Sequence, residues 1–247
     1  MIRVENISKL HLGRPVLTDI NLTVPESSHL GLIGPGGAGK SVLLKIIAGL
    51  IEPDAGKVYI DGIDVHSLEE TELAELRNRI GMLFQNYALF DFMTVSENIG
   101  FPLVQIGEDP ATVEERVVEL LEAIGLPTAA DKFPNELSGG MKKRVSFARA
   151  VIQRPPILLY DDPTAGLDPV TSSKIFALLE EMQENYETTA ITVSHDLGGI
   201  EPLCDHFAML DGGRLVFAGT PDEIERTDVE VVRRFWDGSS GDAWGRP

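Results

Sequence analysis

Gly34-Pro-Gly-Gly-Ala-Gly-Lys40-Ser41 is the stretch that decides the fold, because its residues suit a loop that wraps around a polyphosphate. The glycines let the backbone curl tightly and turn its N–H groups inward toward an anion. The segment 30–33 before the loop is short and apolar, as a buried strand is, and the segment 42–48 after it is apolar at helical spacing. A strand, a glycine-rich loop and a helix in this order predict a phosphate-binding loop.

Two side chains at the end of this loop carry the chemistry. Lys40 is placed to reach the terminal phosphates, and the hydroxyl of Ser41 is placed to ligate a magnesium ion. The helix that begins near Lys40 adds the positive end of its dipole to the same anion. We therefore predict a nucleoside triphosphate bound with Mg²⁺ by Gly34, Pro35, Gly36, Gly37, Ala38, Gly39, Lys40, Ser41 and Val42.

Composition limits the partners and the compartment. The formal net charge of −18 argues against nucleic acid, whose phosphates call for a basic protein surface. The single cysteine, Cys204, excludes an intrachain disulfide and a cysteine-rich metal cluster. Neither a signal-peptide pattern nor an apolar run of about 18 residues is present in the sequence. We expect a cytoplasmic protein that reaches a membrane only by docking on another protein.

Hydrophobic periodicity predicts an α/β fold. Alternation predicts an antiparallel pair at 2–7 and 16–24, and paired glycines at 212–213 predict a hairpin between 205–210 and 214–218. Short apolar runs at 156–160 and 189–193 are typical of buried parallel strands, and 79–84 is another apolar strand. Another strand is expected at 57–62. Helices are expected at 68–77, 111–124, 139–152, 169–185 and 230–235.

A second glycine-rich motif narrows the class of nucleotide-binding protein. Ser138-Gly139-Gly140 stands at the start of a predicted helix and suits a second anion cradle, although alone it is also a plain helix cap. The apolar strand that follows ends in Asp161-Asp162. An aspartate at the end of such a strand holds the magnesium ion in phosphate-loop enzymes.

With these motifs in order, the chain resembles the ATP-binding subunit of an ABC transporter over nearly its whole length. The resemblance rests on residues 34–41, Gln85, 137–141, 158–162, 165–168 and His195. It implies an ABC-type nucleotide-binding domain over residues 1–238, with a parallel-sheet core, an antiparallel β subdomain and a helical subdomain. The expected core is 1–85 and 156–225, the helical insertion 86–155, the C-terminal extension 226–238 and a flexible tail 239–247.

The same resemblance implies how ATP is held. Two copies of the chain would pack head to tail, with Lys40 and Ser41 of one copy and Ser138, Gly139 and Gly140 of the other around one ATP. Gln85 would contact the magnesium ion and the attacking water, beside the metal ligands Ser41 and Asp161. His195 would contact the γ-phosphate, and Asp168 would link the two sites.

Two positions depart from the family pattern. The family places glutamate where this chain has Asp162, whose side chain is one methylene shorter. A catalytic group misplaced by about 1 Å can cost roughly a hundredfold in rate, so we predict slow hydrolysis with intact ATP binding. The family also stacks an aromatic residue on the adenine, and His11 stands near that place. His11 is either this stacking residue or an exposed loop histidine.

The segment 86–102 is the expected docking surface for a multispan membrane permease. Phe90, Phe92 and Met93 would suit a groove that grips a short helix, or they belong to the core of the helical insertion. Docking there would hold the chain at the cytoplasmic face of the inner membrane.

Short signatures suggest a narrower resemblance, to the Mla-type lipid transporters, which work with a permease and an MCE-domain protein. These signatures are residues 41–45, 88–91, 94–98 and 137–145. In that branch a C-terminal extension helps to hold the dimer, so Phe235 and Trp236 are candidate contacts. The expected function is ATP-driven transport of phospholipid between envelope membranes. Two alternatives stay open: an importer ATPase for a polar solute such as an amino acid, and a soluble ABC protein acting on ribosomes or DNA.

Overall fold

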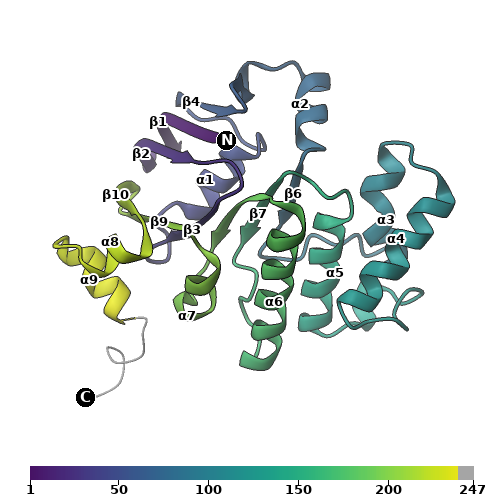
Figure 1. Cartoon of the computed structure of the whole chain (residues 1–247). Coiled ribbons are helices and arrows are strands. Elements are labelled where there is room, and N and C mark those ends of the chain that lie inside the picture. The colour runs from purple at the N-terminus through teal and green to yellow at the C-terminus, as the bar shows by residue number, and fades with distance from the viewer. Residues whose placement is uncertain (239–247) are drawn as a thin grey trace.

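The computed structural model describes residues 1–238, except for the side chains of 184 and 185. Two β-sheets stand side by side, with helices on the faces of the larger one and a separate group of helices at one end (Figure 1). The predicted tail, 239–247, lies outside the described residues. No helix in the described part of the chain combines the length and the apolarity that a membrane crossing needs.

The smaller sheet is antiparallel and has the strand order β2-β1-β4-β5. Its strands are β1 (Ile2–His11), β2 (Arg14–Val24), β4 (Ala55–Ile60) and β5 (Ile63–Asp64). Ile2, Val4 and Ile7 alternate with exposed or half-buried residues along β1, because one face of the sheet packs on the core and the other meets water. The predicted antiparallel pair at the start of the chain is confirmed.

The larger sheet has the order β10-β9-β3-β8-β7-β6. It is parallel from β9 to β6, and β10 pairs antiparallel with β9 at the edge. Every residue of β3, β7 and β8 is buried, which explains why these strands read as short, largely apolar runs. The strands are β3 (His29–Ile33), β6 (Ile80–Leu83), β7 (Ile157–Asp161), β8 (Thr189–Val193), β9 (His206–Asp211) and β10 (Arg214–Gly219).

Six of the nine α-helices in the described residues lie where hydrophobic periodicity predicts them. The α-helices of these residues are α1 (Lys40–Ile47), α2 (Glu70–Arg77), α3 (Val95–Gln105), α4 (Pro110–Ala123), α5 (Gly139–Val151), α6 (Pro169–Tyr186), α7 (Leu197–Ile200), α8 (Pro221–Glu225) and α9 (Glu230–Asp237). Helices α3, α4 and α5 form the helical group on the right in Figure 1. Sequence periodicity did not identify α3, which contains Pro102. Its signal was the capping box of Thr94 and Glu97, each of which accepts a hydrogen bond from the other's backbone N–H.

The C-terminal extension packs on its own chain. Val232 of α9 is fully buried, and the ring of Trp236 meets the ring of Phe207 edge-on at 5.0 Å between centroids. Phe235 is also half-buried against the same core. The two aromatic residues expected as dimer contacts therefore have a role in anchoring α9 to the fold.

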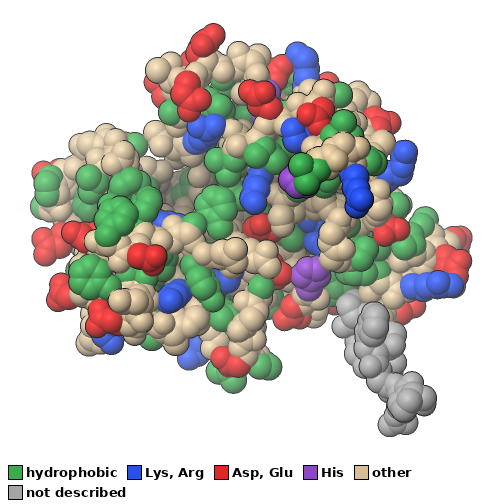
Figure 2. All heavy atoms as spheres, turned by 180° about the vertical axis from the view of Figure 1, so that it is seen from behind, with side chains coloured by type: hydrophobic (Ala, Val, Ile, Leu, Met, Phe, Trp, Pro, Cys, Tyr) green, Lys and Arg blue, Asp and Glu red, His purple; other side chains and the backbone are tan. Residues whose placement is uncertain are grey.

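Charge and apolarity are unevenly distributed on the surface. On the face shown in Figure 2, acidic and basic side chains are interspersed, and hydrophobic side chains gather toward the edge that holds α3 and α4. Phe92 is 75% exposed, and Val104 and Ile106 are also exposed. The end of the molecule with the helical group thus presents apolar side chains to solvent.

Candidate nucleotide-binding site

The glycine-rich loop connects β3 to α1, and at two of its glycines a Cβ would be strained and in close contact with neighbouring residues. Gly34 has φ +135°, and a Cβ there would lie 2.0 Å from the carbonyl oxygen of Leu210. Gly39 has φ +98°, and a Cβ there would lie 2.6 Å from Cδ2 of Leu17. The loop is closed by tight packing against neighbouring strands, so the backbone N–H groups are held in place before any ligand arrives.

A cavity of about 420 Å³ lies over this loop. It brings together most of the predicted site residues from four separate segments of the chain. Val16 and Val193 also line it, and neither was singled out from the sequence. The predicted residues in its wall are Gly36, Gly37, Ala38, Gly39, Lys40, Ser41, Val42, Gln85, Asp161, Asp162 and His195.

Lys40 is held inside the loop. Its ammonium donates to the carbonyl oxygens of Gly34, at 2.6 Å, and Pro35, at 2.9 Å. The side chain is buried, and this burial lowers the pKa of Lys40, against the opposing influence of Asp162 and Asp161. The two carbonyl oxygens thus hold the Lys40 ammonium at the phosphate loop. A bound polyphosphate can replace these carbonyls as the partner of Lys40.

Ser41 and Asp161 form an oxygen pair suited to magnesium. The Ser41 hydroxyl donates to Oδ1 of Asp161 at 2.7 Å, and Asp161 is buried at the end of β7. Gln85 is exposed and contributes to the same wall. A hydroxyl, a carboxylate and an amide are hard oxygen ligands, and Mg²⁺ commonly takes one or two protein ligands together with substrate phosphates.

Asp162 follows directly after β7 in an unusual conformation. Its φ is +51°, in the left-handed region that aspartate tolerates better than most residues. The residue is buried, and burial raises its pKa, while His195, Lys143 and Lys40 act in the opposite direction. Nε2 of His195 lies 3.8 Å from Oδ2 of Asp162, and the His195 side chain is about half exposed. A carboxylate and an imidazole therefore face each other at the edge of the cavity.

The predicted site residues Ser138, Gly139, Gly140 and Asp168 do not line this cavity. Ser138 caps α5 by accepting from the Met141 N–H at 3.3 Å, and neither it nor Gly139 and Gly140 lines the cavity. Asp168 caps α6 by accepting from the N–H and hydroxyl of Thr171, which lowers the pKa of Asp168. One copy of the chain thus presents most of the predicted set around its own phosphate loop, without Ser138, Gly139, Gly140 and Asp168.

His11 stands at the end of β1, paired with Arg14 across the turn into β2. It is exposed and does not line the cavity. Its stacking on adenine stays a prediction.

Lys143 was missed from the sequence. It is fully buried in α5, and its ammonium donates to the carbonyl oxygens of Phe84, Gln85 and Asp162. Desolvation lowers its pKa to about 8, against the opposing charges of Asp162 and Asp161. No sequence signal distinguishes Lys143 from its neighbours, because residues 142–144 are all basic.

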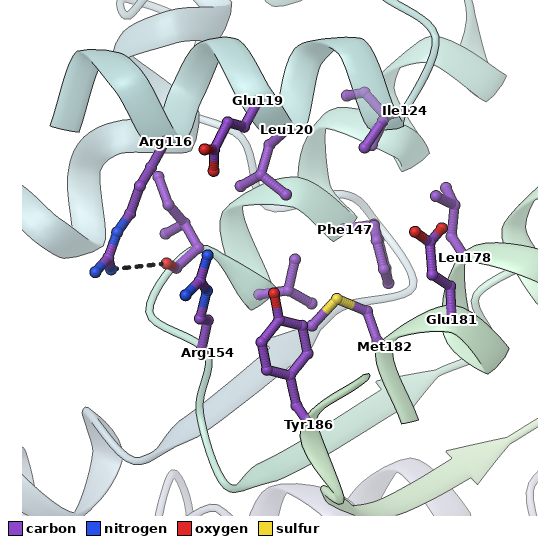
Figure 3. Close-up of a pocket in the computed structure, with 13 residues that line it drawn as sticks. Arg116, Glu119, Leu120, Ile124, Phe147, Arg154, Leu178, Glu181, Met182 and Tyr186 are labelled. Carbon is purple, nitrogen blue, oxygen red and sulfur yellow. Dashed lines mark hydrogen bonds between the residues drawn. The ribbon is translucent and has the colours of Figure 1, made fainter. Parts of the chain in front are cut away.

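Another hollow, of about 160 Å³, lies between α4, α5 and α6, away from these residues (Figure 3). Leu120, Phe147 and Met182 contribute to its apolar lining. At its edge Arg116 donates to the carbonyl oxygen of Ile152 at 3.5 Å, and the guanidinium of Arg154 stands 5.3 Å from the ring centre of Tyr186. None of the motif residues lines this hollow.

Comparison with known proteins identifies the class of this site. The sequence profile of the ABC transporter family matches residues 17–165, which include the phosphate loop, Ser138–Gly140 and Asp161–Asp162. The methionine import ATP-binding protein MetN of Caulobacter vibrioides is 39% identical over 250 residues, covering 100% of this chain and 75% of the relative. A MetN of Rhodopseudomonas palustris is 38% identical over 241 residues, covering 95% of this chain and 65% of the relative.

Solved structures agree with the fold. The dimeric ATP-binding cassette MJ0796, in a post-hydrolysis state with ADP and phosphate, has a TM-score of 0.84 and 33% identity, covering 89% of this chain and 98% of its own. The cbiO1 protein of Clostridium perfringens, part of the cbiONQ transporter complex, has a TM-score of 0.80 and 30% identity, covering 90% of this chain and 89% of its own. The narrower resemblance to Mla-type lipid transporters receives no support from these relatives.

Proposed function

The chain belongs to the ABC transporter family, and on that premise we propose that it powers the import of an amino acid through a separate membrane permease. Proteins of this family bind and hydrolyse ATP, so the chain is an ATPase. The observation that carries the cargo class is the nearly full-length similarity to ATP-binding proteins of methionine import. The chain spans 75% and 65% of the length of those two relatives.

One of the signatures that suggested lipid transport, 94–98, has a local structural explanation. Thr94 and Glu97 form the capping box of α3. Asn98 is fully buried, accepts from the Phe90 N–H, and donates to the carbonyl oxygens of Phe90, Met93 and Thr94. These residues fold the loop 90–94 whatever the cargo is, so they do not report on it. The amino-acid alternative is better supported because the similar proteins act in methionine import, and none of them supports an MCE-domain partner.

The site geometry supports distinct roles for the residues of one copy. Lys40 would exchange its loop carbonyls for the β- and γ-phosphates, and the loop N–H groups would hold the rest of the polyphosphate. Ser41, Asp161 and Gln85 would hold Mg²⁺, whose charge would offset that of the phosphates. Asp162 would orient and polarise the attacking water, and His195 would donate to the γ-phosphate.

A second copy of the chain would complete the site. Ser138, Gly139 and Gly140 form a helix start that lies outside the phosphate cavity of their own chain. A head-to-tail dimer would place this helix start over the γ-phosphate of the partner, where its N–H groups suit an anion. The dimeric state of the MJ0796 cassette is consistent with this arrangement.

A hollow of about 490 Å³ is the proposed docking site for the permease. Phe84, Phe90 and Phe101 line it together with residues of α2, β6 and α5. Phe90 packs against Phe101 at 4.9 Å and Phe92 at 5.8 Å between ring centres, and Phe92 remains largely exposed. An aromatic groove of this kind suits the apolar face of a short helix. Docking there would hold the chain at the cytoplasmic face of the inner membrane.

The test is to purify the tagged chain from gently solubilised native membranes and to identify the bound proteins and lipids by mass spectrometry. We expect a permease and a solute-binding protein. A permease with an MCE-domain protein would refute amino-acid import and support lipid transport, and ribosomes without a permease would refute both.

The recovered complex then allows a functional test. In proteoliposomes, ATP hydrolysis should rise when the solute-binding protein is loaded with methionine or another amino acid. The same complex with Lys40→Ala is the matched control and should show neither ATP hydrolysis nor uptake. Stimulation by none of the twenty amino acids would count against this cargo class.

A further inference from the structure

One face of α5 carries three polar side chains that bind the loop containing Gln85. Lys143, Ser146 and Arg149 recur every three residues, so they share one side of the helix. Ser146 donates to the carbonyl oxygen of Tyr87 at 2.7 Å. Arg149 donates to the carbonyl oxygens of Tyr87, at 3.2 Å, and Ala88, at 2.7 Å. The loop after Gln85 is therefore fastened to α5 through its own backbone.

Lys143 reaches two catalytic segments at once. Its ammonium lies 2.9 Å from the carbonyl oxygen of Gln85, 3.3 Å from that of Phe84 and 3.0 Å from that of Asp162. A lysine ammonium has three donors, and these three carbonyls can use all of them. The side chain has no exposed surface, and a fully buried ammonium is costly unless it is hydrogen-bonded. The arrangement is thus a specific junction between α5, the loop of Gln85 and the end of β7.

The backbone is strained on both sides of the junction, at Asp162, which Lys143 binds, and just after Gln85, where Ser146 and Arg149 bind the loop. Asp162 has φ +51°, and Tyr87 and Ala88 have φ +61° and +51°. Non-glycine residues keep such conformations only where the surrounding contacts impose them. The Asp162 N–H donates to the carbonyl oxygen of Val193 at 2.9 Å, and Lys143 binds the carbonyl of the same residue. The Asp162 carbonyl also accepts from the Ala165 N–H at 3.2 Å, so Lys143 is one of its two partners and the one that ties it to α5.

We propose that Lys143 is a positioning residue for ATP hydrolysis, because it fixes the backbone from which the Gln85 and Asp162 side chains enter the site. The proposal rests on the proposed roles of Gln85 and Asp162. Lys143 does not line the cavity, so it acts through these two residues and not on the nucleotide. The phosphate loop has its own supports and makes no hydrogen bond with Lys143, so ATP binding should be almost independent of this contact.

The experiment compares Lys143→Met and Lys143→Arg with Lys132→Met, the same change at an exposed lysine of the helical insertion. We expect Lys143→Met to lower kcat by roughly tenfold to a hundredfold, because a shift of about 1 Å in a catalytic group has such an effect. The KM for ATP should change by less than about threefold, since the phosphate contacts remain. Lys143→Arg should recover part of kcat, and Lys132→Met should match the wild type.

Hydrogen–deuterium exchange of the full chain supplies a readout besides activity. Lys143→Met should speed exchange in residues 84–90 and 162–168 and leave residues 34–41 unchanged. Unchanged exchange in both segments, or unchanged kcat despite faster exchange, would overturn the proposal. If Lys143→Met does not fold, Lys143→Arg becomes the deciding variant: wild-type exchange with lowered kcat would also overturn the proposal.

The same measurements separate this proposal from the assigned roles of Gln85 and Asp162. Gln85→Ala and Asp162→Asn should each lower kcat without faster exchange in the segments that Lys143 holds. Full turnover in both variants would refute those roles, whereas the exchange results for Lys143→Met would still decide whether it holds the two segments.

Discussion

Replacing Asp162 with glutamate tests the idea that a short carboxylate limits the rate. The added methylene extends the side chain by about 1.5 Å, the length of one C–C bond. In the structure Oδ2 of Asp162 is 3.8 Å from Nε2 of His195, so the carboxylate is too far from the imidazole to form a hydrogen bond with it. Because a misplacement of about 1 Å can cost a hundredfold, we expect kcat to rise by up to about 100-fold, which corresponds to about 2.7 kcal/mol.

The same substitution should carry a measurable cost in stability. Asp162 is buried and has φ +51°, a conformation in which aspartate is favoured over glutamate. The conformational penalty should be about 1 kcal/mol, which lowers Tm by roughly 2–4 °C in a chain of this size. Faster turnover in a less stable protein is the combined signature.

Phosphate release at saturating ATP measures turnover, and a thermal melt measures stability. Asp162→Asn is the control: it keeps the size of the side chain, removes the charge, and should lose turnover while still binding ATP. An Asp162→Glu rate equal to or below that of the wild type, with ATP affinity intact, would refute the argument from reach and show that the site is adapted to aspartate.

Three further outcomes follow from particular contacts. Gly39→Ala should lower the free energy of unfolding in urea by roughly 2–4 kcal/mol, because the new Cβ would lie 2.6 Å from Leu17 and the backbone has φ +98°. Gly36→Ala is the control: its Cβ would meet open space, so its stability should stay near that of the wild type. Burial lowers the pKa of His29 below 6.5, so the folded chain favours the neutral ring. Above about pH 6.5 the neutral ring contributes its full stability. As the pH drops below about 6.5, the free energy of unfolding decreases by at most about 1.4 kcal/mol per pH unit, until the folded-state pKa is reached. Urea titrations between pH 7.5 and 5.5 should show a smaller decrease for His29→Gln than for the wild type. Phe92→Ala, at a 75% exposed side chain, should leave Tm unchanged and reduce recovery of the permease in the pull-down, and equal recovery would move the docking site elsewhere.

The sequence was sufficient for most of the secondary structure. Buried parallel strands such as β7 and β8 are short runs of apolar and β-branched residues, and helices such as α4 keep their apolar positions at helical spacing. Helix α3 was not predicted because Gly100 and Pro102 interrupt its helical pattern of apolar residues. Its start was nevertheless readable, since a capping box depends on residues that are neighbours in sequence.

The phosphate loop was determined by the sequence alone, because its requirements are local. Left-handed backbone at Gly37 and Gly39 needs glycine, and Lys40 and Ser41 follow them at fixed positions on one helix start. The positions of Asp161, Asp162 and His195 relative to that loop depended on the tertiary structure. They meet it because β3, β8 and β7 are neighbours in the sheet and all three run in one direction, so that the segments that follow them gather at one edge.

The role of Lys143 was decided only by the tertiary structure. Lys142, Lys143 and Arg144 are consecutive basic residues of one helix, and nothing in their order distinguishes them. Lysine is almost never fully buried, so a sequence reading places all three in solvent. Packing turns the face of α5 that contains Lys143 toward Gln85 and Asp162, which lie about 60 and 20 residues away along the chain. A contact of this kind depends on how distant segments come together, which local residue patterns do not specify.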